Sequence, residues 1–156
     1  MAAGAEARPV VGALITDTHG RVFVQRRSED RRLFPGCWDV VGGAVEEGEG
    51  RYEALRREIE EETGWSLRRI LAELAREHWT HGGVEHVETD YLVEVDGDLT
   101  APRLERDKHT DFAWVGAGEL ALLDENTWRT GSTFIKDLVS AAHRQLAVMA
   151  EVRAAD

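Results

Sequence analysis

Three glutamates near the middle of the chain have the types and spacing needed for metal chemistry. Glu58, Glu61 and Glu62 lie within one five-residue stretch, and on a helix that turns about 100° per residue they fall on one arc. Like charges at these spacings repel, and carboxylates in the last turn of a helix face the negative end of its dipole. A divalent cation would remove both penalties, and oxygen ligands favour Mg²⁺ or Mn²⁺. The cluster therefore predicts a metal site that neutralises an anionic substrate.

A helix over Arg51 to Thr63 is expected to carry this cluster. Tyr52, Leu55 and Ile59 recur at spacings of three and four residues and form one apolar stripe. Gly64 follows as a natural C-terminal stop. For the acid run alone, a solvated acidic face paired with Arg56 and Arg57 is the competing interpretation.

The wider spacing decides between these interpretations. Gly43 to Trp65 reads GAVEEGEGRYEALRREIEEETGW, which resembles the signature box of the Nudix hydrolase family. The preceding FPGCWDVVGG is similar to the stretch that commonly leads into that box, and only Trp65 departs, where an aliphatic residue is usual. The matching positions are Gly43, Glu49, Arg57, Glu58, Ile59, Glu61, Glu62, Gly64 and Trp65.

The resemblance implies a role for each acidic position of the box. Glu58, Glu61 and Glu62 would ligate Mg²⁺, or alternatively Mn²⁺, with help from the carbonyl of Gly42 or Gly43. Water would attack a phosphorus of a diphosphate linkage while the metal lowers the pKa of the water and neutralises phosphoryl charge.

The resemblance also implies supporting and proton-accepting groups. Arg57 would pair with Glu49 and hold the loop against the helix. Glu61 is the first candidate for the group that deprotonates the water. In several family members this base comes instead from a loop before a late strand, here residues 103–111. The candidates on that loop are Glu105, Asp107, His109 and Asp111, and His109 could titrate near neutral pH.

Residues outside the box must recognise the rest of the substrate. Arg26 and Arg27 stand near the end of an expected strand, where a guanidinium could hold a distal phosphate. Trp38 precedes Gly42 closely enough to stack on a base. For both arginines surface pairing with nearby acids is an equal alternative, and for Trp38 a place in the core is the alternative.

The elements that must position these residues form one α/β domain. The pattern predicts a mixed sheet and two main helices, and the resemblance implies a Nudix-like α/β/α sandwich. We expect a flexible tail over residues 1–8, a single domain over 9–152 and a C-terminal tail over 153–156. Strands at 9–16 and 21–27 are predicted to form a hairpin, and Gly42 and Gly43 to end a short strand at 38–41. Further strands are expected at 67–80, 84–95 and 112–115, and helices at 118–123 and 134–152. The strand at 84–95 alternates, so that one face is expected to carry Val87, Thr89, Tyr91, Val93 and Val95.

Charge and composition restrict the partners. The net charge of −11 would repel nucleic acid and anionic membranes, and no apolar run is long enough for a membrane helix. One cysteine, Cys37, excludes an intrachain disulfide. With no apolar leader segment, this favours a cytoplasmic location. A homodimer is one of the oligomeric states left open.

The expected function is metal-dependent cleavage of a diphosphate linkage in a nucleoside diphosphate derivative. A nucleoside triphosphate or a nucleotide sugar is the expected kind of small-molecule substrate. Two alternatives stay open. One is a Nudix-type nucleotide-binding sensor without turnover. The other is an isoprenyl-diphosphate isomerase, whose chemistry would need Cys37 as an acid–base partner.

Overall fold

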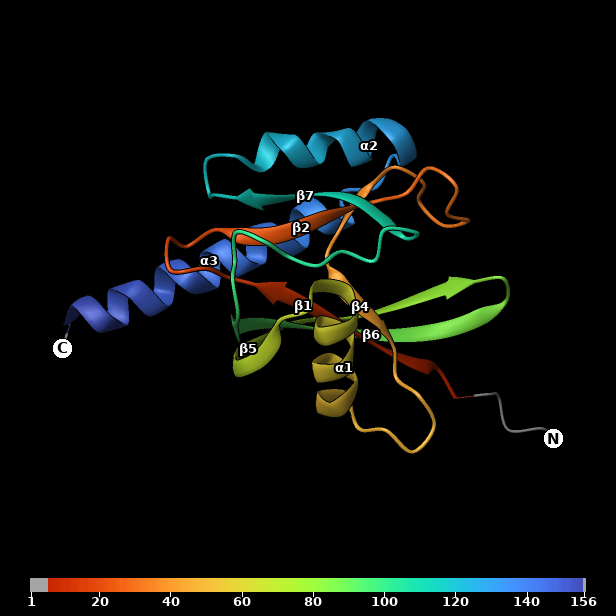
Figure 1. Cartoon of the computed structure of the whole chain (residues 1–156), viewed down its shortest axis with the longest axis horizontal. Coiled ribbons are helices and arrows are strands. Elements are labelled where there is room, and N and C mark those ends of the chain that lie inside the picture. The colour runs from red at the N-terminus through yellow and green to blue at the C-terminus, as the bar shows by residue number, and fades with distance from the viewer. Residues whose placement is uncertain (1–5, 156) are drawn as a thin grey trace.

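Two β-sheets and three α-helices make up the computed structural model, which describes residues 6–155 (Figure 1). The strands are β1 (Arg8–Ile15), β2 (Val22–Arg27), β3 (Trp38–Asp39), β4 (Val41–Ala44), β5 (Ser66–His81), β6 (Val84–Asp96) and β7 (His109–Val115). The helices are α1 (Arg51–Thr63), the short 3₁₀ helix η1 (Leu120–Leu123), α2 (Asp124–Thr130) and α3 (Phe134–Ala155). The predicted α/β class with a mixed sheet is confirmed, and α2 is a third helix that was not expected.

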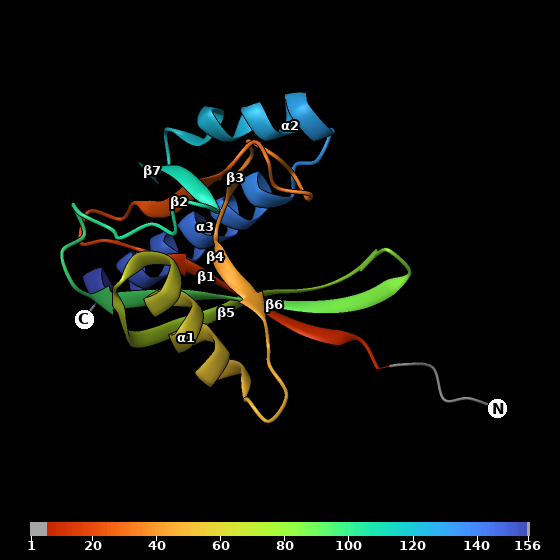
Figure 2. The same ribbon diagram turned by 45° about the vertical axis from the view of Figure 1, so that its right-hand side comes forward.

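The larger sheet is mixed and has the order β4-β1-β6-β5. β1 pairs antiparallel with β4 and parallel with β6, while β5 and β6 form a long antiparallel hairpin. The tip of that hairpin extends beyond the rest of the molecule (Figures 1 and 2). The smaller sheet is antiparallel with the order β3-β2-β7.

The predicted hairpin of the first two strands is wrong. β1 and β2 belong to different sheets, and the contact between them is one isolated bridge from Thr16 to Val22. The turn itself forms as expected, because Asp17 accepts hydrogen bonds from the backbone N–H groups of His19 and Arg21 at 2.9 and 2.8 Å. Both edges of β1 are already occupied by β4 and β6, so β2 cannot pair along it.

The expected end of a strand at Gly42 and Gly43 is also wrong. Both glycines lie inside β4, where Gly42 pairs with Gly12 and Gly43 with Val11. Only Val40 separates β3 of the smaller sheet from β4 of the larger one. The segment from Trp38 to Ala44 therefore crosses from one sheet to the other.

Helix α1 has the predicted bounds and covers one face of the larger sheet (Figure 2). Leu55 and Ile59 are fully buried, whereas Tyr52 is 62% exposed, so it does not extend the apolar stripe into the core. Gly64 ends the helix in the left-handed conformation at φ 76°, where a side chain would be strained. Trp65 packs edge-on against Phe23 with ring centroids 5.0 Å apart, which agrees with a packing role.

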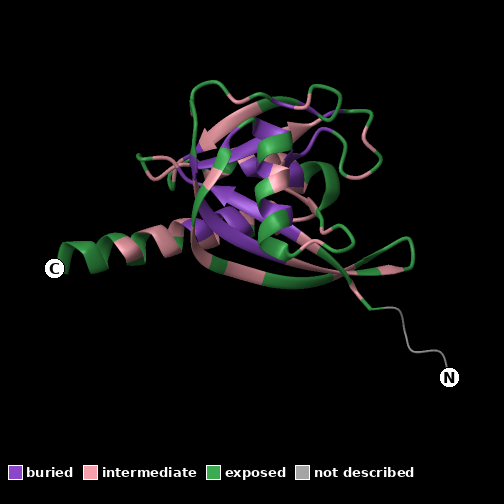
Figure 3. Ribbon diagram, turned by 60° about the horizontal axis from the view of Figure 1, so that its bottom comes forward, coloured by how far each residue is buried: buried purple, intermediate pink, exposed green. Residues whose placement is uncertain are grey.

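Two apolar clusters fill the molecule, and the buried residues concentrate where the sheets meet the helices (Figure 3). One cluster includes Leu55, Ile59 and the predicted inner face of β6, with Tyr91 and Val93. The other includes Leu92 and lies against α3. Both faces of β6 therefore pack against apolar side chains, including the face that carries the buried Asp90.

Both expected tails overlap regular structure. Residues 1–5 lie outside the described part of the chain, and Arg8 is the first residue of β1. At the other end α3 continues to Ala155, beyond the predicted end at 152. Within residues 6–155, none of the helices combines the length and apolar character needed to span a bilayer.

Candidate functional site

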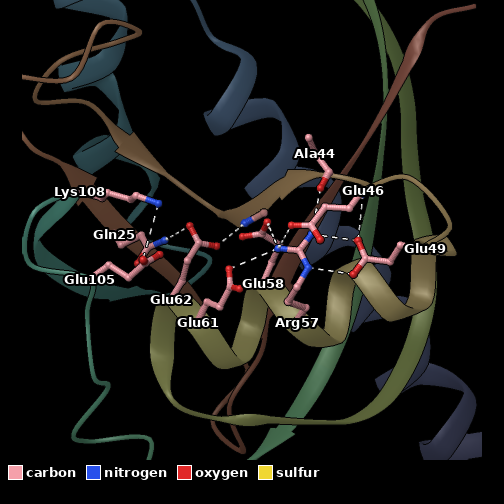
Figure 4. Close-up of polar contacts among 11 residues, drawn as sticks. Gln25, Ala44, Glu46, Glu49, Arg57, Glu58, Glu61, Glu62, Glu105 and Lys108 are labelled. Atoms are coloured by element: carbon pink, nitrogen blue, oxygen red, sulfur yellow. Dashed lines mark hydrogen bonds and ion pairs between the residues drawn. The ribbon is translucent and has the colours of Figure 1, made fainter.

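Arg57 organises the loop between β4 and α1. Its guanidinium donates to both oxygens of Glu49 at 2.8 and 2.9 Å and to the Ala44 carbonyl at 3.1 Å. It also donates to Glu58 at 2.8 Å and to Glu61 at 3.3 Å. Figure 4 shows Arg57 between Glu49 on one side and the two helix glutamates on the other. The bidentate bond from Arg57 holds the pKa of Glu49 at about 2, so this pair stays charged.

Glu62 is a buried carboxylate held by neutral donors. The Gly42 N–H donates to its Oε2 at 2.8 Å, and Nε2 of Gln25 donates to its Oε1 at 3.2 Å. Only 6% of the residue is exposed, and no Lys or Arg of the described chain pairs with it. Burial, and then the charge of Glu58, raises the pKa of Glu62 well above its ordinary value. A cation beside this carboxylate would offset that penalty.

Glu58 and Gly43 are in direct contact. A Cβ added at Gly43 would overlap the carboxylate of Glu58, so only glycine allows the strand backbone to approach it. Burial raises the pKa of Glu58, while the neighbouring Arg57 lowers it. Glu61 lies farther out, with about half of its side chain exposed.

The three predicted metal ligands are neighbours but are not gathered around one point. Throughout residues 6–155 no three Asp, Glu, His or Cys side chains are grouped closely enough to hold an ion. Arg57 engages Glu58 and Glu61, whereas Gly42 and Gln25 engage Glu62. The donor set nevertheless fits a hard divalent cation, because it consists of carboxylate oxygens. They lie beside the backbone of Gly43, where a side chain would overlap the Glu58 carboxylate.

The loop candidates for the base differ in their surroundings. Glu105 reaches from the loop between β6 and β7 toward Gln25 and Glu62 (Figure 4), and its charge contributes to the raised pKa of Glu58 and Glu62. His109 is 2% exposed at the start of β7. Burial, then the charges of Arg31 and Arg27, lowers the pKa of His109 to about 4. His109 therefore does not titrate near neutral pH, contrary to expectation.

A cavity of about 390 Å³ is lined mainly by residues of β3, β5, β6, α2 and α3, and none of Glu58, Glu61 and Glu62 is among its lining residues. Trp38, Asp39, Arg27 and Glu88 are among the residues that line it. The link between this cavity and the glutamate cluster is Asp39, whose charge contributes to the raised pKa of Glu62. The volume of the cavity suits a drug-sized or nucleoside-sized group.

Of the three predicted substrate residues, Arg27 and Trp38 line this cavity and Arg26 does not. Arg27 lines the cavity and donates to Asp39 at 3.0 Å. Arg26 instead donates to Glu125 at 2.7 Å and lies 4.5 Å from the ring centroid of Trp38. Trp38 is only 4% exposed. Arg26 covers one face of its ring, and another part of the side chain borders the cavity. Glu125, the partner of Arg26, is 99 residues away in the sequence, whereas Asp39, the partner of Arg27, is 12 residues away.

Four polar residues at the site were missed by the sequence reasoning. Gln25 orients Glu62, and Asn126 holds the backbone N–H and carbonyl of Trp38 at 2.7 and 2.8 Å. Glu88 and Asp90 lie on the face of β6 opposite the expected core face. For Gln25, Glu88 and Asp90 the available signal was the presence of an amide or an acid inside a strand, since such groups are buried only with partners.

Sequence comparison identifies a family and named relatives. The model of the NUDIX domain family matches residues 6–138. A protein named nucleoside triphosphatase NudI from Salmonella newport (strain SL254) is 34% identical over 143 residues, covering 85% of this chain and 98% of the relative. NudI proteins from other Salmonella strains give closely similar values.

Solved structures with the same fold include a MutT NUDIX hydrolase from Burkholderia pseudomallei. It is 31% identical with a TM-score of 0.63, covering 73% of this chain and 86% of that one. A MutT protein from Methanosarcina mazei Go1 has a TM-score of 0.73 at 23% identity, covering 92% and 98% of the two chains. The second likeness concerns the fold alone.

Proposed function

The chain belongs to the Nudix family of hydrolases, and from this premise we propose that it is a Mg²⁺-dependent pyrophosphohydrolase acting on nucleoside triphosphates. The observation that carries the proposal is the buried Glu62 carboxylate, which has neutral donors, a neighbouring Glu58 and no cationic partner within the described chain. Such a group is costly to bury unless a cation accompanies it.

Glu58, Glu61 and Glu62 would hold the metal together with the backbone at Gly43. When bound, Mg²⁺ supplies charge neutralisation at the phosphoryl oxygens and activation of water. The chain itself supplies orientation: Gly42 and Gln25 fix the Glu62 carboxylate, and Arg57 fixes the loop through Glu49 and Ala44. Mn²⁺ satisfies the same oxygen ligands and is expected to substitute.

Two glutamates are candidates to accept the proton of the attacking water. Glu61 is half exposed on α1, and Glu105 approaches Glu62 from the loop before β7. Either carboxylate would take the proton as the new phosphorus–oxygen bond forms and the bridging phosphorus–oxygen bond breaks. Comparing Glu61→Gln with Glu105→Gln over a pH series separates the two, since loss of the base removes the acidic limb of the rate profile.

A nucleoside triphosphate is favoured over a nucleotide sugar because the NudI relatives at 34% identity are named nucleoside triphosphatases. The cavity bordered by Trp38 and Arg27 would hold the nucleoside, and the charge of Asp39 on its wall acts on Glu62 of the glutamate cluster. The small-molecule substrate agrees with a net charge of −11, which disfavours nucleic acid and anionic membranes as partners. A cytoplasmic location and a homodimer stay predictions, the latter checked by sedimentation.

The decisive experiment is a panel of nucleoside triphosphates and nucleotide sugars with Mg²⁺ and product identification. We expect release of nucleoside monophosphate, phosphate or pyrophosphate from at least one triphosphate. EDTA or Glu61→Gln should suppress this release, while the control Glu60→Gln, an exposed residue of the same helix, should not. Turnover that survives both EDTA and Glu61→Gln would contradict the mechanism.

The two alternatives predict different results in the same assays. A sensor would bind a nucleotide without releasing product. An isomerase would depend on Cys37, which is buried and lines the cavity near Arg27 and Arg129. Cys37→Ala should therefore leave nucleotide hydrolysis intact and would abolish only an isomerase activity.

A further inference from the structure

Glu88 and Asp90 form a carboxyl pair inside the protein. They lie two residues apart on β6, so their side chains share one face of the sheet. Asp90 is fully buried and pairs across the sheet with Gly12 of β1 and Ala75 of β5. A Cβ added at Gly12 would overlap Oδ1 of Asp90, so the glycine makes the room that this carboxyl occupies.

One proton is shared by this pair. Burial, followed by the hydrogen bond and charge of Glu88, raises the pKa of Asp90 to about 10. Asp90 therefore keeps its proton at neutral pH and donates it to Glu88. In the described part of the chain both Asp90 oxygens are buried without a hydrogen-bond partner of standard geometry, so Glu88 is the neighbour left to receive the proton. Burial also raises the pKa of Glu88, whereas Asp90 and Trp79 lower it, so Glu88 is the member of the pair that ionises first.

Glu88 brings the negative charge of the pair to the wall of the cavity. The cavity combines Glu88 with aromatic and aliphatic side chains, including Trp38, Trp79, Phe134 and Ile135. Arg27, a cation on the same wall, is already bonded to Asp39. An ionised carboxylate accepts hydrogen bonds and cannot donate one. A ligand in the cavity should therefore bind better if it presents an N–H donor to Glu88, and less well if it presents a carbonyl oxygen to Glu88.

We propose that Glu88, positioned by Asp90, is a specificity-determining residue that accepts a hydrogen bond from the exocyclic amino group of a nucleobase. Bases with such a group are cytosine, adenine and guanine. Uracil and hypoxanthine lack it, and uracil carries a carbonyl oxygen in place of the amine of cytosine. This inference rests on the proposed function, because it assumes that the nucleoside part of the substrate occupies the cavity.

The test compares bases that differ in one group. For the full chain with Mg²⁺, the ratio of kcat/KM for CTP over UTP, and for GTP over ITP, is measured. An amino group that meets a charged acceptor should give a preference of about tenfold or more in at least one pair. Glu88→Gln should reduce that ratio to within about threefold of unity, because the amide also offers a donor to a carbonyl oxygen.

Two further variants separate a specific effect from a general one. Asp90→Asn should keep the preference, because its amide still donates to Glu88. Glu94→Gln removes a charge from the same face of β6, where Glu94 pairs with Arg69 outside the cavity, and should leave the ratio unchanged.

Titration of tryptophan fluorescence with CMP and UMP gives a readout without turnover, since Trp38 and Trp79 border the cavity. CMP should bind more tightly to the wild type, and Glu88→Gln should remove the difference.

The outcomes distinguish this inference from the proposed function. Hydrolysis of triphosphates without any preference for amino-bearing bases overturns the role of Glu88 and leaves the hydrolase intact. A preference that Glu88→Gln does not change overturns it as well. Absence of hydrolysis across the whole panel instead contradicts the proposed function, and equal binding of CMP and UMP would then reject the base preference independently.

Discussion

The backbone N–H of Gly42 donates a 2.8 Å hydrogen bond to Oε2 of Glu62, which ties strand β4 directly to the last turn of helix α1. The opposite oxygen of the same carboxylate accepts a bond from Gln25 of β2. One glutamate thus joins the helix to both sheets. Its charge is desolvated in the process, and this has measurable consequences for stability.

Glu62→Gln should stabilise the metal-free protein at pH 8. The pKa of Glu62 is raised above 4.5 in the folded state, so the folded protein holds this proton more tightly than the unfolded chain. The contribution of Glu62 to the stability of the folded state is therefore favourable at low pH and is lost as the pH rises above 4.5. We expect the variant to be more stable than wild type by about 2 kcal/mol at pH 8, with a smaller difference at pH 4.5. Urea denaturation in EDTA at both pH values measures this.

Addition of Mg²⁺ should reverse that order. A ligand that binds only the folded state stabilises it, so wild type should gain stability at pH 8 while Glu62→Gln gains little. Equal stabilisation of both proteins by Mg²⁺ would argue against Glu62 as a ligand.

Gly43→Ala should impair metal use without unfolding the protein. The added Cβ would overlap the Glu58 carboxylate and displace it. Since Gly43 does not have a positive φ, alanine introduces no backbone strain there. We expect the Mg²⁺ concentration for half-maximal activity to rise about tenfold. Gly118→Ala is the matched control, because nothing lies within 4 Å of its Cβ. Identical metal dependence in the two variants would contradict the assigned contact.

Arg57→Lys should reduce turnover although the charge is kept. Lysine cannot reproduce the two parallel bonds to Glu49 together with the bond to the Ala44 carbonyl. The loop before α1 would lose its fixed position, and kcat should fall by about tenfold or more. Arg56→Lys, on the same helix, serves as the control. Hydrogen exchange at residues 44–50 should increase in Arg57→Lys, and an unchanged exchange rate would show that the loop is held by other contacts.

His109→Gln should alter the pH dependence of stability and leave catalysis near wild type. The pKa of His109 falls from 6.5 to about 4 on folding, so the unfolded chain binds more protons between these values and stability increases as pH rises through them. The groups that face it are Arg31, Arg27, Lys108 and Asp107. Removing the imidazole should flatten this increase by about 2 kcal/mol. Thermal denaturation at pH 4.5 and pH 7 measures the change.

The same variant tests the loop base. Because His109 is buried and its pKa of about 4 makes it a weak base, kcat should stay within about twofold of wild type at pH 7. A large loss of activity in folded His109→Gln would instead assign the proton transfer to this residue. Glu105→Gln is the informative partner, since Glu105 is the loop carboxylate that approaches Glu62.

Helix α1 could be predicted to the residue, because its signals are local. The apolar residues Leu55 and Ile59, together with Gly64, define its inner face and its end. That Glu58, Glu61 and Glu62 lie near one another was predictable for the same reason, since spacing along one helix decides which residues share a face, while their role as metal ligands stays a prediction. Tyr52 was misplaced because helix periodicity does not say where the covering sheet ends.

The arrangement of the strands depends on contacts between distant segments. The residues at 17–20 have the chemistry of a tight turn, but that turn joins two sheets and not two neighbours in one sheet. Glu88 and Asp90 illustrate the same limit at the site. Alternation along β6 identified its apolar face correctly, while the polar face could be understood only once α3 and the cavity were seen against it.

The crossing of the chain from β3 to β4 has a consequence for how this protein can diversify. Trp38 and Asp39 border the cavity, and Gly42 and Gly43 contact the proposed metal ligands Glu62 and Glu58, with Val40 and Val41 between them. This segment is shared by both tasks and tolerates little change. Most of the remaining cavity wall comes from β5, β6, α2 and α3, whereas the glutamate cluster lies on α1. Substitutions there can retune the preferred substrate during evolution or engineering, while the hydrolytic centre stays as it is.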